Sequence, residues 1–133
     1  MKKVNCILLI DDNEADNEFH RRAILKAGVS ERVEIANRAQ KALDYLINCG
    51  NTNVPVPELI FLDINMPGMN GFEFLEEYNK LNETMKAKMV VFMLTSSLLP
   101  EDKEKAEHSG QVSAFLTKPL TAQMVTEIID RHF

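Results

Sequence analysis

The chain carries residues that suit phosphoryl-transfer chemistry directly after short apolar runs, at Asp11, Asp12, Asp63, Thr95 and Lys118. A carboxylate can act as the nucleophile towards phosphorus. A hydroxyl and an ammonium group can bind the oxygens of the group that is transferred. Alone, each residue has a plainer interpretation, such as a helix cap for Asp12 or a turn for Asp63. The chemistry therefore depends on whether the fold brings these side chains together.

Short apolar runs alternate with helical patterns along the whole chain. The unbroken runs are Cys6–Ile10, Leu59–Leu62 and Val90–Leu94, and two weaker strands are expected at Val33–Ala36 and Ala114–Thr117. Unbroken runs of this length are typical of strands that are covered on both faces. With right-handed crossovers, five strand–helix units predict an α/β fold: a doubly wound five-stranded parallel sheet with helices on both faces. We expect the flavodoxin-like strand order 2-1-3-4-5.

Helices are predicted between these runs, from apolar positions at helical spacing. The positions are Phe19, Ala23 and Ala27, then Ala39, Ala42, Leu43, Leu46 and Ile47, then Phe74, Leu75, Tyr78 and Leu81, and finally Met124, Val125, Ile128 and Ile129. Gly28 is expected to end the first helix. The almost wholly polar segment Pro100–His108 is expected to be the most loosely held helix. Gly50–Pro57 is expected to be an extended surface loop, and His20, a residue without metal-ligand spacing, to lie at the surface.

The carboxyl ends of parallel strands lie at one edge of the sheet, where ligands bind in this fold class. Asp11, Asp12 and Asp63 are therefore expected close together. Each like-charged pair a few ångströms apart costs about 4 kcal/mol at an effective dielectric constant of about 20. A divalent cation would offset this cost, and Mg²⁺ suits one or two carboxylates combined with phosphate oxygens and water. The sequence thus predicts a Mg²⁺ site in which one carboxylate becomes an aspartyl phosphate.

Four segments closely resemble the receiver domain of two-component response regulators, in the family's order and spacing. They are Cys6–Asn13 (CILLIDDN), Phe61–Gly71 (FLDINMPGMNG), Val91–Ser96 (VFMLTS) and Phe115–Leu120 (FLTKPL). The resemblance spans essentially the whole chain, so we expect a single receiver domain over residues 1–133 with no output domain. The chain is similar to stand-alone regulators of the chemotaxis and phytochrome-associated types. The implied role is a signalling switch that catalyses only its own phosphorylation and dephosphorylation, not an enzyme.

The resemblance implies roles at matching positions. Asp63 accepts the phosphoryl group from a phosphohistidine partner, which is a histidine kinase or a phosphotransfer protein. Asp11, Asp12 and Asp63 bind Mg²⁺, together with the backbone carbonyl of Asn65. Lys118 pairs with the phosphoryl group.

The resemblance also implies residues that respond to phosphorylation. Thr95 hydrogen-bonds a phosphoryl oxygen on activation, and Phe115 stands where the family carries a switch aromatic, more usually tyrosine. Asn65 and Ser97 lie where the family tunes the lifetime of the phosphate. The bond before Pro119 corresponds to the family's cis peptide bond. A downstream protein target, and any homodimer, is expected to use the fourth and fifth strand–helix units.

The composition and net charge of the chain limit the kinds of partner and setting that we expect for it. The chain has 133 residues, of which 45% are apolar and 26% charged, as in one ordinary globular domain. A net charge of −5 without a basic patch argues against nucleic acid as a partner. Cys6 and Cys49 lack metal-ligand spacing and suit a reduced cytoplasmic setting. The first apolar run stops at Ile10, too short for a membrane span or a signal peptide.

Two alternatives use the same residues differently. An aspartyl-nucleophile phosphatase needs a second acid two positions after the nucleophile, and Asn65 argues against it. A protein-binding module that no longer depends on phosphate would not need the site, yet all its residues are present. Mg²⁺-dependent labelling that is lost in Asp63→Asn would separate these readings.

Overall fold

The computed structural model describes residues 3–94 and 99–133. Its strands are β1 (Ile7–Ile10), β2 (Val33–Ala36), β3 (Leu59–Asp63), β4 (Met89–Leu94) and β5 (Val112–Thr117). Neighbouring strands are parallel, in the order β2-β1-β3-β4-β5. The predicted α/β class and parallel sheet are confirmed, and the strand bounds differ from the predicted runs by two residues at most.

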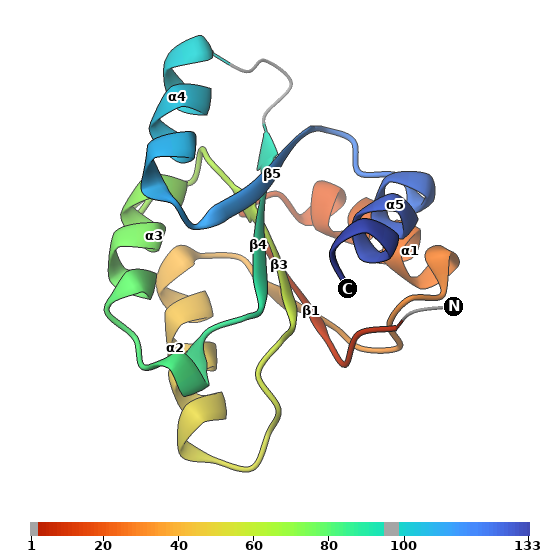
Figure 1. Ribbon diagram of the computed structural model, residues 1–133, viewed down its shortest axis with the longest axis horizontal. Helices are drawn as coiled ribbons and strands as arrows, with labels where there is room; N and C mark the ends of the chain where they lie inside the picture. Colours follow the sequence, from red (N-terminus) through yellow and green to blue (C-terminus); the bar gives the residue numbers. More distant parts are fainter. Residues whose placement is uncertain (1–2, 95–98) are drawn as a thin grey trace.

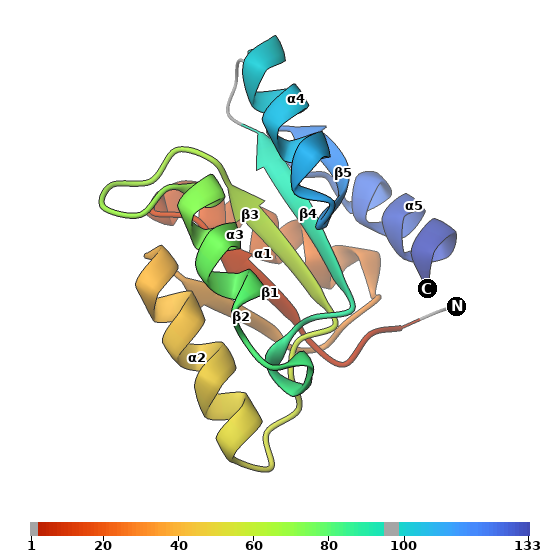
Figure 2. The same cartoon turned by 60° about the vertical axis from the view of Figure 1, so that its left-hand side comes forward.

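The helices form a layer on each side of the sheet. On one side lie α1 (Glu14–Ala27) and α5 (Ala122–His132) (Figure 1). On the other lie α2 (Ala39–Asn51), α3 (Gly71–Asn79) and α4 (Pro100–Ser109), with a short 3-10 turn, η1 (Glu83–Met85), before β4. Figure 2 shows α2 and α3 packed side by side in front of the strands. Within the described ranges, no helix is both long and apolar enough to cross a membrane.

Alternation along the central strands divides the core in two. Leu8 of β1 and Ile60 of β3 point into the cluster beneath α2 and α3, whereas Leu9 and Phe61 point into the cluster beneath α1 and α5. All four side chains are almost completely buried. Because both faces are covered, β1 and residues 59–62 of β3 are apolar throughout.

The buried face of α1 differs from the predicted stripe that begins at Phe19. The helix buries Asn17, His20 and Ile24, while Phe19 is 53% exposed. The expectation that His20 lies at the surface is therefore wrong. The physical reason is that the first half of α1 packs against a polar strand end, where the Asn17 side chain donates a hydrogen bond to the carbonyl of Asp11 (2.8 Å).

Gly28 and Gly50 have different roles near the ends of two helices. Gly28 ends α1 as predicted, with φ of 71° in the left-handed region that favours glycine. In contrast, α2 continues to Asn51, so the predicted loop Gly50–Pro57 starts two residues too early. At Gly50 a Cβ atom would collide with the side chain of Met85. This glycine therefore allows close packing within a helix and does not start a loop.

Candidate functional site

The ends of β1 and β3 bring three carboxylates together. Asp11 follows β1 directly and Asp63 is the last residue of β3, its neighbour in the sheet. One carboxylate oxygen from each of Asp11, Asp12 and Asp63 lies within 4.8 Å of the others. Asp11 and Asp63 are 1% and 2% exposed, whereas Asp12 faces solvent. The expectation that these three carboxylates lie close together is therefore confirmed.

Lys118 brings a positive charge into this cluster from the end of β5. Its Nζ lies 2.9 Å from Oδ2 of Asp11 and 3.7 Å from Oδ1 of Asp63. The peptide bond between Lys118 and Pro119 is cis, as the resemblance implied. The lysine side chain is only 17% exposed, so the ammonium lies inside the site and is not extended into solvent.

A fourth carboxylate, which the sequence analysis missed, also contacts the lysine. Oδ2 of Asp16 accepts a hydrogen bond from Nζ of Lys118 at 2.9 Å. Asp16 lies in the first turn of α1, which starts three residues after Asp11. A carboxylate in a first helical turn is favoured by the helix dipole. This position next to a strand end was the signal that could have identified it.

Local hydrogen bonds fix the two strand ends. The backbone N–H of Asn13 donates to Oδ1 of Asp11 at 3.0 Å, and the Asn13 side chain caps α1 by accepting from the N–H of Asp16 at 2.9 Å. At the other strand, the N–H of Asn65 donates to the Asp63 carboxylate. The N–H of Gly71 donates to the carbonyl of Ile64 at 2.8 Å, which closes the loop after β3. The carboxylates are therefore held by backbone geometry.

Burial and like charges perturb the ionisation of this site. Burial and then the charge of Asp11 raise the pKa of Asp63 from 3.8 to about 7, against the lowering effect of Lys118. For Lys118, burial favours the neutral amine, but the carboxylates of Asp11 and Asp16 outweigh it and raise its pKa above the ordinary value. The site therefore has a permanent ammonium beside a carboxyl group that changes charge near neutral pH.

The donor set fits a hard divalent cation. All three clustered side chains offer carboxylate oxygens, the ligands that Mg²⁺ prefers. Oδ1 of Asp63 is buried and has no hydrogen-bond donor among residues 3–94 and 99–133. Buried polar atoms are normally satisfied, so an oxygen of this kind is well suited to a metal or to an incoming phosphoryl group.

Of the other predicted site residues, the structure describes Asn65 and Phe115. Asn65 lies two residues after the end of β3 and is exposed. Phe115 of β5 is partly buried and packs against the core cluster on the α2 and α3 side. Thr95 and Ser97 lie outside the described residues.

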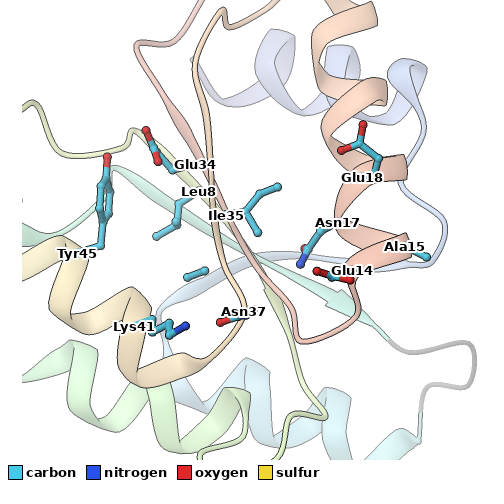
Figure 3. Close-up of a pocket in the computed structure, with 11 residues that line it drawn as sticks. Leu8, Glu14, Ala15, Asn17, Glu18, Glu34, Ile35, Asn37, Lys41 and Tyr45 are labelled. Carbon is cyan, nitrogen blue, oxygen red and sulfur yellow. The ribbon is translucent and has the colours of Figure 1, made fainter.

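A separate groove of about 780 Å³ lies at the edge strand β2 (Figure 3). Glu14 and Asn17 of α1 border it on one side, and Lys41 and Tyr45 of α2 on the other. Its lining includes none of the clustered aspartates and not Lys118. The carboxylate site is thus a feature of the strand ends and not of this groove.

Comparisons with a family model, with curated proteins and with solved structures all match response regulators. The family model described as the response regulator receiver domain matches residues 7–130. The chain is 36% identical to the two-component response regulator ARR17 of Arabidopsis thaliana, over 92% of this chain and 80% of that protein. Among solved structures, a two-component response regulator from Cytophaga hutchinsonii has a TM-score of 0.85 and 31% identity, covering 98% and 97% of the two chains.

The bacteriophytochrome response regulator AtBRR is also similar, with a TM-score of 0.77 and 28% identity over 98% of this chain and 93% of that one. The share of a relative that the chain spans varies widely. It is 75–80% for some curated relatives and 14–16% for others. The matched unit is thus found both in proteins of similar length and within much longer ones.

Proposed function

Because the chain belongs to the response regulator receiver family of two-component systems, we propose that Asp63 accepts a phosphoryl group from a phosphohistidine partner. The position of Asp63 carries this proposal. Its carboxylate is 2% exposed, lies 3.7 Å from the Lys118 ammonium, and has one oxygen without a donor among the described residues. A nucleophile has to keep an oxygen free in this way, which gives a reason for an otherwise unfavourable arrangement.

In the transfer, a carboxylate oxygen of Asp63 forms a bond to phosphorus while the phosphorus–nitrogen bond of the donor breaks. The electron pair of that bond stays on the imidazole nitrogen, and the product on the protein is an acyl phosphate. Water later attacks this acyl phosphate and releases inorganic phosphate and the carboxylate. The nucleophile must be ionised, so positive charge close to Asp63, which favours its ionised form, favours the reaction.

Magnesium, when bound, supplies positive charge that neutralises the oxygens of the transferring group. The side chains of Asp11, Asp12 and Asp63 would hold it, together with the backbone carbonyl of Asn65. The chain's own cation, Lys118, is already within 3.7 Å of the nucleophile and binds a phosphoryl oxygen once the group is transferred.

Phosphorylation is proposed to alter a protein-binding surface. The Thr95 hydroxyl donates to a phosphoryl oxygen, and Phe115 on β5 changes its packing in response. Asn65 and Ser97 set how long the acyl phosphate survives. The donor is a histidine kinase or a phosphotransfer protein, and a downstream protein binds the altered surface around α4 and β5. The domain is therefore proposed to act as a switch.

Labelling with a small phosphodonor tests the proposal. We expect radiolabelled acetyl phosphate and Mg²⁺ to label the protein with at most one phosphate per chain. Label should be lost in Asp63→Asn and on addition of EDTA, and kept in the control Asp44→Asn, which changes an exposed aspartate on α2. Equal labelling of Asp63→Asn would disprove the assignment. Repeated turnover of a phosphate ester would instead support the phosphatase alternative.

A further inference from the structure

Lys118 contacts more carboxylates than the proposed function requires. Its Nζ lies 2.9 Å from both Asp11 and Asp16, but 3.7 Å from Asp63. An ammonium group has three donors. The two short contacts therefore favour the carboxylates beside the nucleophile over the nucleophile itself.

Asp16 is not part of the metal-binding cluster. The carboxylates that converge within 4.8 Å are Asp11, Asp12 and Asp63. Asp16 approaches the lysine from the first turn of α1, where its own N–H is held by the Asn13 side chain at 2.9 Å. Its side chain is 38% exposed, so its charge stays partly solvated when the lysine moves. The backbone of Asp16 is therefore fixed, and Lys118 is its one ion-pair partner among the described residues.

We propose that Asp16 is a positioning residue that holds Lys118 back in the unphosphorylated protein. As the ammonium moves from 3.7 Å towards a phosphoryl oxygen on Asp63, its contact with Asp16 lengthens. Part of the free energy of the new contact is then spent on breaking the old one. Asp16 thus lowers the affinity of the unphosphorylated domain for a phosphoryl group at Asp63. This inference rests on the proposed function of Asp63.

The size of the effect follows from the exposure of the pair. Ion pairs that are partly open to solvent contribute up to about 1 kcal/mol, which corresponds to about a fivefold change in an equilibrium constant. Losing the Asp16 charge should therefore tighten binding of a phosphoryl mimic by about three- to fivefold. A much larger change would not fit a pair of this kind.

The test is the affinity for beryllium trifluoride, a mimic of the phosphoryl group, measured by calorimetry at saturating Mg²⁺. Saturating Mg²⁺ is needed because removing a negative charge near the cluster also weakens the binding of Mg²⁺. Asp16→Asn should bind more tightly than the wild type, and Asp16→Glu, which keeps the charge, should bind like the wild type. Glu14→Gln is the matched control. It removes a carboxylate from the same helical turn, but Glu14 forms no ion pair among the described residues.

The same pair of measurements in a Lys118→Ala background shows whether the effect passes through the lysine. There, Asp16→Asn should no longer tighten binding. Equal tightening in that background would overturn the proposal, because the Asp16 charge would then act on the anion directly. Tightening by Glu14→Gln, or no tightening by Asp16→Asn, would also overturn it. If the lysine variant binds too weakly to measure, the comparison of Asp16→Asn with Glu14→Gln decides.

The proposed function and this inference fail in different ways. If Asp63 is not the acceptor, the wild type will bind no beryllium trifluoride that depends on Asp63 and Mg²⁺. If only the inference is wrong, the wild type will bind it and Asp16→Asn will not bind it more tightly.

Discussion

Replacing Asp63, the proposed phosphoryl acceptor, should stabilise the metal-free protein, by an amount that grows with pH. Asp63 has a pKa of about 7 in the folded chain, against an ordinary value of 3.8. Between these values the folded protein keeps a proton that the unfolded chain has released. The free energy of unfolding of the wild type therefore falls as pH rises through this window, and the loss is complete above a pH of about 7. The asparagine side chain in Asp63→Asn cannot ionise, so the free energy of unfolding of this variant does not fall for this reason.

The magnitude follows from the two pKa values. Each pH unit between them is worth about 1.4 kcal/mol, which gives a ceiling of about 4 kcal/mol at a pH of about 8. At a pH of about 5 the wild type has lost only about 1.5 kcal/mol. The stability advantage of Asp63→Asn should thus increase by about 2–3 kcal/mol between these two conditions. The amide has nearly the same shape as the carboxyl group, so packing contributes little to the difference.

Urea unfolding in EDTA at both pH values measures this advantage. Asp44→Asn, an exposed aspartate-to-asparagine change outside the cluster, controls for general charge effects and should not reproduce the trend. Parallel loss of stability in the wild type and Asp63→Asn as pH rises would contradict a raised pKa at Asp63. It would then follow that Lys118 compensates the Asp63 charge fully, despite their separation of 3.7 Å.

Other changes test the structure around the site. The Tyr78 hydroxyl accepts a hydrogen bond from the N–H of Ala87 at 2.8 Å, so Tyr78→Phe should lower the urea-derived free energy of unfolding by about 1–2 kcal/mol with an unchanged m value. Asn70 forms a capping box with Glu73, so Asn70→Ala should lower the thermal stability by about 1 kcal/mol, and Asn70→Asp should not. Burial lowers the pKa of His20 from 6.5, so the unfolded chain takes up a proton first as pH falls below 6.5. His20→Leu should therefore lose less stability on acidification than the wild type, as followed by circular dichroism.

The convergence of the main site residues could be predicted from the sequence because it depends on chain topology alone. Asp11, Asp63 and Lys118 each follow a strand, and parallel strands end at the same edge of the sheet. Apolar runs locate those ends to within a residue or two, which is enough to bring the side chains together. No knowledge of side-chain conformation was needed for this step.

What the sequence did not predict depends on how each helix is rotated about its axis. The apolar pattern of α1 suggested Phe19 as a core residue, whereas the structure buries Asn17 and His20. The polar strand end requires polar neighbours, so Phe19 at the start of the predicted stripe is exposed, whereas Ala27 at its end packs against the core. The same rotation brings Asp16 to Lys118, a contact that spacing in the sequence cannot show.

Burial first and the neighbouring negative charge second raise the pKa of Asp63, and the same cluster of negative charge contacts Lys118 through Asp11 and Asp16. Four carboxylates lie around a single ammonium group, which can approach only two of them at 2.9 Å. Asp63, the proposed nucleophile, is left with the longer contact, and its raised pKa of about 7 keeps it partly protonated near neutral pH. Added positive charge, from a metal or from a lysine released by Asp16, would ionise Asp63 and neutralise the group that it attacks. The charge balance that makes the resting site unfavourable is therefore also what would make its reactivity depend on the metal and on the position of Lys118.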